Sequence, residues 1–188
     1  GGTCASMRGF IERFSIDLDF DLIKVENLEQ TKSKLKKTFQ RLGLIVHDES
    51  KNYLQFFLKY PNNPGERNTL KFDVSFPVPK NNDCEPVRLI EIDRILHCQT
   101  IETMFANKLI AVKGRYDQGR SVAGRDLFDV YSFILNGFEF KEEIIEELSG
   151  KKTENYLKEL KIFIEKHFTQ KDIDEDLNHL LPVDKFRK

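Results

Sequence analysis

The sequence predicts an α+β fold, in which a mixed sheet with flanking helices is followed by a helical C-terminal part. Two observations support this prediction. Runs of alternating apolar and polar residues, typical of strands, are concentrated before residue 99. From Thr100 onward the apolar residues follow helical spacing. We therefore expect two domains, a core over residues 1–98 and a helical region over residues 99–188 that packs on the core.

The expected elements begin with a helix over residues 4–13, directly after the turn Gly1-Gly2-Thr3. A strand over residues 14–22 is expected next, and then an amphipathic helix over residues 27–42 that closes at Gly43. The remaining expected strands cover residues 43–47, 53–60, 70–76 and 87–92, and the remaining helices cover residues 101–113, 125–136, 141–148, 154–167 and 171–180.

Composition limits the classes of function. A chain of 188 residues with 39% hydrophobic and 32% charged side chains is long enough to bury a proper core. Its 30 basic and 31 acidic side chains nearly cancel, so any attraction to nucleic acid must come from a local patch. The sequence has no apolar run of about 18 residues and no visible signal peptide, so we expect a cytoplasmic protein without membrane contact. Three cysteines are too few for a disulfide framework, and we expect buried, reduced thiols at Cys4, Cys84 and Cys98.

The stretch FSIDLDFDL, residues 14–22, places three carboxylates on one face of its strand, at Asp17, Asp19 and Asp21. Side chains two apart on a strand project to the same side, at a spacing of about 7 Å. Such a row of like charges repels itself and becomes favourable when a divalent cation lies among the oxygens. A half-buried strand with a solvated face would show the same pattern, so the pattern leaves both interpretations open. Asp73 in LKFDVSF adds an acid on the polar face of another expected strand.

The Gly1-Gly2-Thr3 turn has properties suited to phosphate binding. Glycines let the backbone approach a ligand closely, and a helix N-terminus offers unpaired N–H groups to an anion. By itself such a sequence usually marks only a tight turn. Because it precedes Asp17 by fourteen residues, it would place phosphate donors beside a metal site, as nucleotidyl transfer requires. The sequence opens on this turn without an initiator methionine, so we expect further residues to precede it.

These motifs occur in an order that resembles a known family. GGTCASMRGFIERFSIDLDF resembles the opening motif of the AbiEii-type nucleotidyltransferase toxins, in which Gly-Gly/Ser-Thr, a helix, Arg-x-Ser and Asp-x-Asp follow one another. Asp73 is similar to the third carboxylate of the polymerase-β-like nucleotidyltransferase superfamily. ETMFANKLIAVKGR and GRDLFDVY are similar to the family's later block, with its Ala-x-Lys-Leu helix, basic loop and Arg-Asp-x-x-Asp. The resemblance covers about residues 1–135 and implies a polymerase-β-like nucleotidyltransferase core.

The resemblance further implies a metal-dependent enzyme that transfers a nucleoside monophosphate from an NTP to an acceptor hydroxyl. Asp17 and Asp19 would bind two Mg²⁺ ions, with Mn²⁺ as the alternative, and Asp73 would bind the second ion and act as, or position, the base. The resemblance assigns Gly1, Gly2 and Thr3 to contacts with the triphosphate, and it assigns Lys108 to neutralising phosphate charge. The other residues that it assigns to substrate binding are Arg13, Ser15, Arg125 and Asp126.

Family analogy also implies tRNA or another RNA as acceptor, a toxin-like role in phage defence, and an antitoxin partner. Two other classes stay open. A small-molecule nucleotidyltransferase, such as a drug-modifying enzyme, would show an acidic acceptor pocket in place of a basic groove. A non-catalytic descendant would bind nucleotide or a partner without turnover.

Several of these residues also have structural interpretations. Lys108 would be a surface lysine that extends its ammonium to water. Asp126 would be a helix-start charge that pairs with Arg115 or Arg120. Arg13 and Ser15 would only flank the end of the strand. The basic stretch from Lys113 to Arg120, expected to be a loop, could grip an RNA phosphate.

Overall fold

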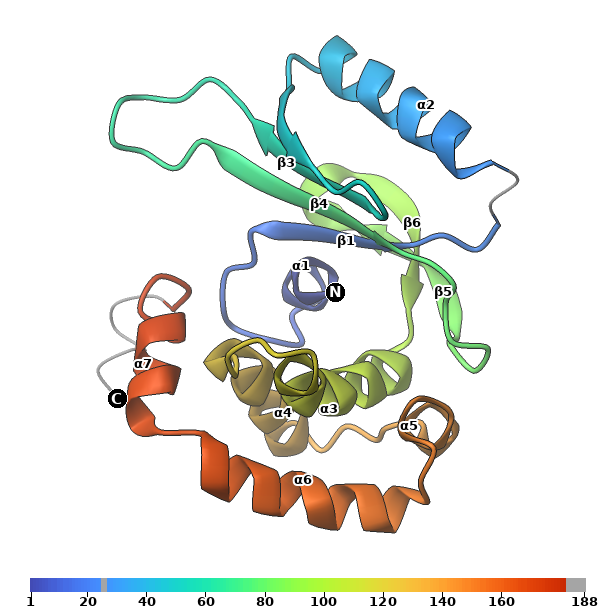
Figure 1. Ribbon diagram of the computed structural model, residues 1–188, viewed down its shortest axis with the longest axis vertical. Coiled ribbons are helices and arrows are strands. Elements are labelled where there is room, and N and C mark those ends of the chain that lie inside the picture. The colour runs from blue at the N-terminus through green and yellow to red at the C-terminus, as the bar shows by residue number, and fades with distance from the viewer. Residues whose placement is uncertain (25–26, 182–188) are drawn as a thin grey trace. The chain divides into compact units, whose positions relative to one another are not determined.

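The computed structural model describes residues 1–24 and 27–181, and the chain divides into two compact units (Figure 1). The sheet unit contains Gly1 and Ile16–Val78, and the helical unit contains Gly2–Ser15 and the chain from Pro79 onward. A mixed sheet and helices confirm the predicted α+β class. The division differs from the expected boundary at residue 98, because residues 2–15 and 79–98 group with the helices. The expected packing of one part on the other stays a prediction.

In its described residues, the sheet unit contains a four-stranded sheet in the order β1-β4-β3-β2. β1 pairs with β4 in parallel, while β3 pairs with β4 and with β2 in antiparallel fashion. The elements of this unit are β1 (Asp17–Asp21), α2 (Leu28–Arg41), β2 (Ile45–Glu49), β3 (Leu54–Lys59) and β4 (Thr69–Ser75).

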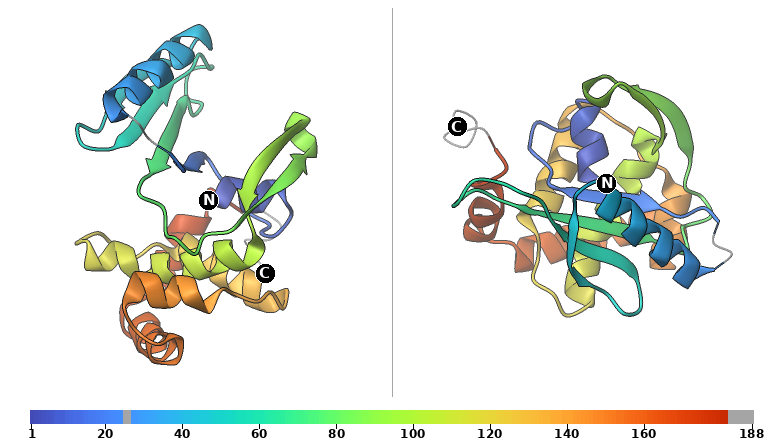
Figure 2. Two further views of the ribbon diagram at one scale, coloured as in Figure 1. Left: turned by 90° about the vertical axis from the view of Figure 1, so that its right-hand side faces the viewer. Right: turned by 90° about the horizontal axis from the view of Figure 1, so that it is seen from above.

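Helix α2 covers one face of the sheet (Figure 2). It begins after Asn27, whose side chain accepts a hydrogen bond from the Gln30 N–H at 2.9 Å, as an N-cap does. Phe39 of α2 packs with Leu54, Phe56 and Leu58, the buried set of β3. Because side chains alternate along a strand, the polar residues of β3 and β4 project to the other face, which we call the open face.

In its part up to residue 181, the helical unit combines a short N-terminal helix, a two-stranded antiparallel hairpin and five further helices (Figure 1). Its elements are α1 (Gly2–Met7), β5 (Cys84–Leu89), the 3₁₀ turn Ile90–Ile92, β6 (Arg94–Gln99), α3 (Ile101–Asp117), α4 (Gly124–Leu135), α5 (Glu142–Ser149), α6 (Thr153–His167) and α7 (Gln170–Leu177).

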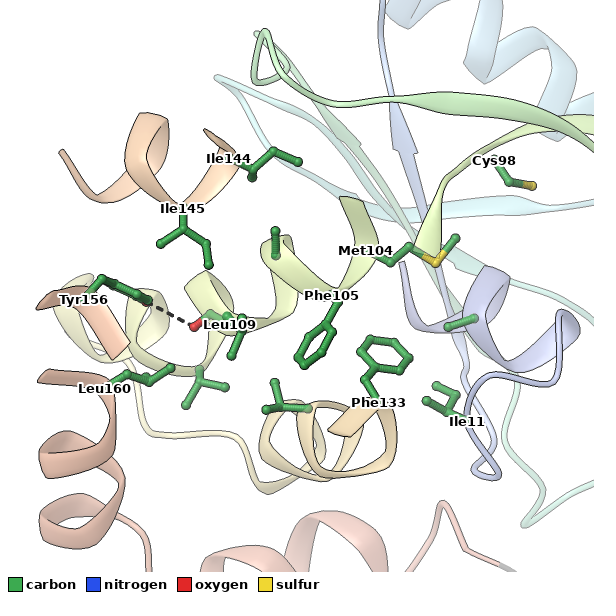
Figure 3. Close-up of a cluster of buried hydrophobic side chains, with 14 of the residues drawn as sticks. Ile11, Cys98, Met104, Phe105, Leu109, Phe133, Ile144, Ile145, Tyr156 and Leu160 are labelled. Carbon is green, nitrogen blue, oxygen red and sulfur yellow. Dashed lines mark hydrogen bonds between the residues drawn. The ribbon is translucent and has the colours of Figure 1, made fainter. Parts of the chain in front are cut away.

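The helical unit has its own apolar core (Figure 3). Phe105 of α3 lies edge-on to Phe133 of α4, with ring centroids 5.3 Å apart. Ile145 of α5 is fully buried in the same cluster. Tyr156 of α6 donates a hydrogen bond to the Leu109 carbonyl at 3.1 Å, so its one polar atom is satisfied inside the core. Among the helices of the described residues, none is both long enough and apolar enough to cross a membrane.

Three of the expected elements differ most from the helices and strands of the structure. The helix expected over residues 4–13 spans Gly2–Met7 instead, so Gly2 and Thr3 begin the helix and do not form the expected turn. It ends early because the chain turns at Gly9, with φ +73°. Of the strand expected over residues 87–92, only residues 87–89 lie in a strand, β5, while residues 90–92 form the 3₁₀ turn of a hairpin. The second arm of the hairpin, β6, was not expected. The helix expected to end at residue 113 continues to Asp117, so the residues before 118 do not form a basic loop.

The prediction of three buried thiols was wrong for one cysteine. Cys98 is buried and Cys4 is half-buried, but Cys84 is exposed near the start of the hairpin. All three are reduced, as expected. Burial and the adjacent Cys98 thiol raise the pKa of Cys4 to about 11.

Candidate active site

Asp17, Asp19 and Asp73 project from the open face of the sheet unit, on which Asp21 also lies. In the parallel pairing of β1 with β4, Asp19 is the register partner of Asp73, and Asp17 is the partner of Lys71. Register partners on neighbouring strands point to the same side of a sheet, and Asp17 lies two residues before Asp19 on β1. The structure therefore brings Asp17, Asp19 and Asp73 to one face, with an acid from each strand placed side by side.

Asp73 is held by two donors at one of its oxygens. Lys71, two residues earlier on β4, places Nζ 2.6 Å from Oδ2. Gln55, the register partner of Asp73 on β3, donates from Nε2 to the same oxygen at 2.9 Å. The side chains of Lys71 and Asp73 are each 29% exposed, so water and ions reach this pair. Oδ1 of Asp73 takes part in neither bond and is the oxygen available for other chemistry.

The acids of the open face fit a divalent cation by type and by shared face. Carboxylate oxygens are the donors that Mg²⁺ and Mn²⁺ prefer. In residues 1–24 and 27–181, no three His, Cys, Asp or Glu side chains are drawn together closely enough to form a ready-made metal site. The ammonium of Lys71 stands beside Asp73 as the local positive charge. Binding of a metal would therefore require the carboxylates to move together, and the metal assignment stays a prediction.

The two N-terminal glycines are packed closely against polar side chains of their own units. A Cβ atom on Gly1 would lie 2.7 Å from the Cβ atom of Asp19, inside the sheet unit. A Cβ atom on Gly2 would lie 2.9 Å from Nη2 of Arg13 and 3.0 Å from Oγ of Ser15, inside the helical unit. No other residue type fits either position without displacement. The glycines thus allow close approach of Asp19, Arg13 and Ser15, and the expected approach of a phosphate stays a prediction.

Thr3, in the first turn of α1, is bonded to Ser15. The Thr3 hydroxyl donates to Oγ of Ser15 at 3.0 Å, which links the start of α1 to the segment that follows it. Ser6 on the same helix donates to the Arg13 carbonyl at 3.0 Å. These bonds hold Arg13 and Ser15 against α1. The Arg-x-Ser segment therefore supports the start of α1 through these bonds.

A buried charge network joins α3 and α4 to the segment after α1. Arg13 donates from Nε and Nη2 to the two carboxylate oxygens of Asp129, at 2.6 and 2.7 Å. Nζ of Lys108 lies 2.9 Å from both Asp129 and Asp126. Nε of Arg115 donates to Asp126 at 2.7 Å. We call these five side chains the charge network, and its three cations and two anions leave it one charge positive.

Burial and pairing oppose each other in the charge network. Burial raises the pKa of Asp126, but the nearby Lys108 and Arg115 outweigh it and lower this pKa from 3.8 to about 2. Burial lowers the pKa of Lys108, and the two aspartates outweigh it, so its pKa lies above 10.5. Both groups are therefore charged at neutral pH. Lys108 and Asp126 each stabilise the charged form of the other.

The network changes the interpretation of two predicted residues. Lys108 is not a surface lysine, since only 17% of its side chain is exposed and it bonds two carboxylates. Asp126 pairs with Arg115, one of the two alternatives expected from the sequence. Arg125 lies at the start of α4, where its backbone N–H is 3.5 Å from a carboxylate oxygen of Asp176. A direct contact of these residues with substrate stays a prediction.

Sequence reasoning missed the partners in both units. Asp129 was noticed only as part of Arg-Asp-x-x-Asp, and nothing nearby in sequence indicated that it binds Arg13, 116 residues away. Lys71 and Gln55 were not considered as partners of Asp73. The signal for Lys71 was present, because residues two apart on a strand share a face.

The expected basic loop is not available as a unit for phosphate binding. Lys113 and Arg115 belong to α3, Lys113 lies 3.6 Å from Asp117, and Arg115 binds Asp126. Arg120 is exposed after the helix. A single exposed arginine is a weak basis for a basic groove.

An acidic pocket of about 670 Å³ lies in the helical unit, around the starts of α3 and α5. Lys141 in this pocket pairs with Asp83 at 2.6 Å. The acidic side chains that line the pocket are Asp83, Glu102, Glu139, Glu142, Glu143 and Glu146. Their excess over Lys141 gives the pocket a negative potential, which favours a cationic occupant.

Comparison with known proteins bears on the family of the chain. Searches of curated proteins and of solved structures give no significant match. A family model described as "Nucleotidyl transferase AbiEii toxin, Type IV TA system" matches residues 1–185, nearly the whole chain. The chain therefore belongs to the AbiEii family of nucleotidyl transferase toxins of type IV toxin–antitoxin systems.

Proposed function

We propose that this protein transfers a nucleoside monophosphate from an NTP to an acceptor hydroxyl, with Mg²⁺ held by Asp17, Asp19 and Asp73. The observation that carries the proposal is the register of β1 and β4, which sets Asp19 beside Asp73 on the open face of the sheet. Membership of a nucleotidyl transferase family supports the reaction class. Two bound Mg²⁺ ions would supply charge stabilisation for the attacking and leaving oxygens.

Asp73 is the residue best placed to accept a proton. Its Oδ2 is occupied by Lys71 and Gln55, which fixes the orientation of the carboxylate. Oδ1 is then free of these two bonds and can take the proton of the acceptor hydroxyl. Asp17 and Asp19 would serve as metal ligands only.

The triphosphate is assigned to Gly1, Gly2 and Thr3, as the family resemblance implies. The exposed backbone of Gly1, which is packed closely against Asp19, supports this assignment for Gly1, whereas Gly2 is buried at the start of α1. Arg13 and Ser15 are assigned to positioning, since Arg13 is buried and bonded to Asp129. The net positive charge of the network would favour a negatively charged phosphate near Lys108.

The reaction is tested by incubating the protein with each labelled NTP, Mg²⁺ and total tRNA. We expect Asp17→Asn to reduce labelling by at least about 100-fold, because an amide cannot replace a charged metal ligand. Asp21→Asn is the matched control, since Asp21 belongs to the same row but has Ser75 as its register partner. This control should stay within about threefold of wild type. Equal labelling by wild type and Asp17→Asn would reject the proposed reaction.

The toxin role and the antitoxin partner follow from the family and are proposed for this chain on that basis. Transfer of nucleotides to tRNA would stop translation, so induced expression should arrest growth. Asp17→Asn, expressed to the same level, should not. Arrest by both proteins would separate toxicity from nucleotidyl transfer.

The acidic pocket favours a second candidate, transfer to a cationic small molecule. An acceptor that carries amines and a hydroxyl, such as an aminoglycoside, matches the charge of this pocket. The same assay with an aminoglycoside in place of tRNA distinguishes the two. Label on the small molecule, lost in Glu102→Gln, supports the second candidate, whereas label on RNA alone rejects it.

A further inference from the structure

Lys71 lies among the carboxylates of the open face and neutralises part of their charge. It is the register partner of Asp17 on β1, and its Nζ atom lies 2.6 Å from Oδ2 of Asp73 on its own strand. Asp73 is in turn the register partner of Asp19. Lys71 is therefore adjacent, across or along the strands, to two of the three acids.

The neighbours of Lys71 on the other side hold Asp73 in the same orientation. On β3, Gln55 is the register partner of Asp73, and Phe57 is the partner of Lys71. Gln55 and Lys71 donate to the same oxygen, from an adjacent strand and from the same strand. The carboxylate is thus fixed by one neutral donor, which stays in place, and one cation.

The two donors differ in how easily they can be displaced. Lysine carries a compact, strongly hydrated charge on a flexible stem, and this side chain is 29% exposed. A divalent cation has twice the charge and takes several oxygens at once, so it competes with the ammonium for Asp73. The ammonium can move into water without leaving a buried polar group unpaired.

We propose that Lys71 is a positioning residue that acts as a built-in counter-ion for the metal-binding acids. It holds Asp73 in place and offsets the repulsion among the acids before a metal binds, and the metal displaces it. The inference rests on the proposed function, because it takes Asp17, Asp19 and Asp73 as metal ligands. It adds that the protein binds metal more weakly than its acids alone would, because the ion must first replace Lys71.

The inference predicts a gain of metal affinity when the charge is removed. Lys71→Gln should bind Mn²⁺ about tenfold more tightly than wild type, because a neighbouring positive charge no longer repels the ion. Lys71→Arg keeps the charge and should stay within about threefold of wild type. A residue with a packing role alone would lower affinity when replaced, or leave it unchanged.

The test is calorimetric titration of the protein with MnCl₂ in the absence of nucleotide, so that it does not depend on activity. Lys59→Gln is the matched control, because Lys59 is a half-buried lysine of the same open face whose register partners are Thr69 and Ile45. Its Mn²⁺ affinity should equal that of wild type. Thermal melts followed by circular dichroism establish that each variant is folded, and Lys71→Met, which also removes the charge, takes the place of Lys71→Gln if that variant is unstable.

The outcomes separate this inference from the proposed function. Equal Mn²⁺ affinity of wild type and Lys71→Gln would overturn the role of Lys71 and leave the metal site intact. Tighter binding by Lys71→Arg to the same degree as Lys71→Gln would also overturn it, since charge would not be the cause. Absence of Mn²⁺ binding in every variant would overturn the metal site itself, and with it both proposals.

Discussion

Replacement of Asp129 by asparagine tests the charge network most directly. Asp129 is fully buried on α4 and bonds Arg13 through both of its oxygens, and Lys108 through one of them. Asparagine has nearly the same shape but no charge. The variant therefore leaves Lys108 with the carboxylate of Asp126, and it leaves the guanidinium of Arg13 without the carboxylate that it binds through two nitrogens.

The magnitude follows from the burial of the partners. Removal of one member of a buried ion pair costs about 3–5 kcal/mol, because the remaining charge stays buried without compensation. The side chain of Arg13 is 3% exposed and that of Lys108 is 17% exposed, so Lys108 can regain some hydration and Arg13 cannot. We expect a loss of about 3 kcal/mol in the free energy of unfolding. Such a loss is a large fraction of the roughly 5–15 kcal/mol of a typical domain.

The assay is urea unfolding followed by circular dichroism at 222 nm. Most of this helical signal comes from the helical unit, which contains most of the helices in the described residues. Glu154→Gln is the control, because Glu154 pairs with Lys158 at 2.6 Å on the surface, with side chains 79% and 68% exposed. Exposed pairs of this kind contribute less than about 0.5 kcal/mol. A loss below about 1 kcal/mol for Asp129→Asn, or one equal to that of the control, would refute the argument from burial.

Three further predictions concern single groups. The pKa of Asp126, lowered to about 2, gives this carboxylate about 2 kcal/mol of stabilisation that is present above pH 4 and lost as pH falls toward 2. Urea midpoints between pH 6 and pH 2 should therefore fall less in Asp126→Asn than in wild type, and parallel curves would contradict this. Iodoacetamide at pH 8, read by mass spectrometry, should label the exposed Cys84 well before Cys4, whose pKa of about 11 keeps it protonated; equal rates would count against it. Tyr156→Phe should lower the free energy of unfolding by about 1 kcal/mol, since the Leu109 carbonyl within α3 loses its side-chain donor, and an unchanged urea midpoint would show that this bond is dispensable.

Elements whose signals are local were predicted well. Helix α2 was expected over residues 27–42 and spans Leu28–Arg41, because its cap residue Asn27 and its apolar stripe can both be read from neighbouring positions. The alternation in β1 and β4 predicted a polar face that carries Asp17, Asp19 and Asp73, and both strands are present. Backbone geometry alone sets the periods of two and 3.6 residues on which these predictions rest.

The hairpin was poorly predicted because it lacks such a period. In β6, Ile95 and Leu96 are adjacent and both are exposed, so neither face is marked as buried. Pro86 lies within β5, where a sequence pattern argues against a strand. Pairing of the two arms holds these residues extended, and Val87, Leu89 and Cys98 pack into the core of the helical unit.

The sequence by itself determined that three acids occur at strand spacing, that a Gly-Gly-Thr segment precedes them, and that the chain belongs to a family of nucleotidyl transferases. Only the tertiary structure decided which groups those residues meet: Asp73 with Lys71 and Gln55, and Arg13 with Asp129. The reason is physical. Which faces a segment presents follows from its own backbone, whereas the partner of a charged side chain depends on strand register and helix packing between distant segments. Those are fixed only when the whole chain buries its apolar surface.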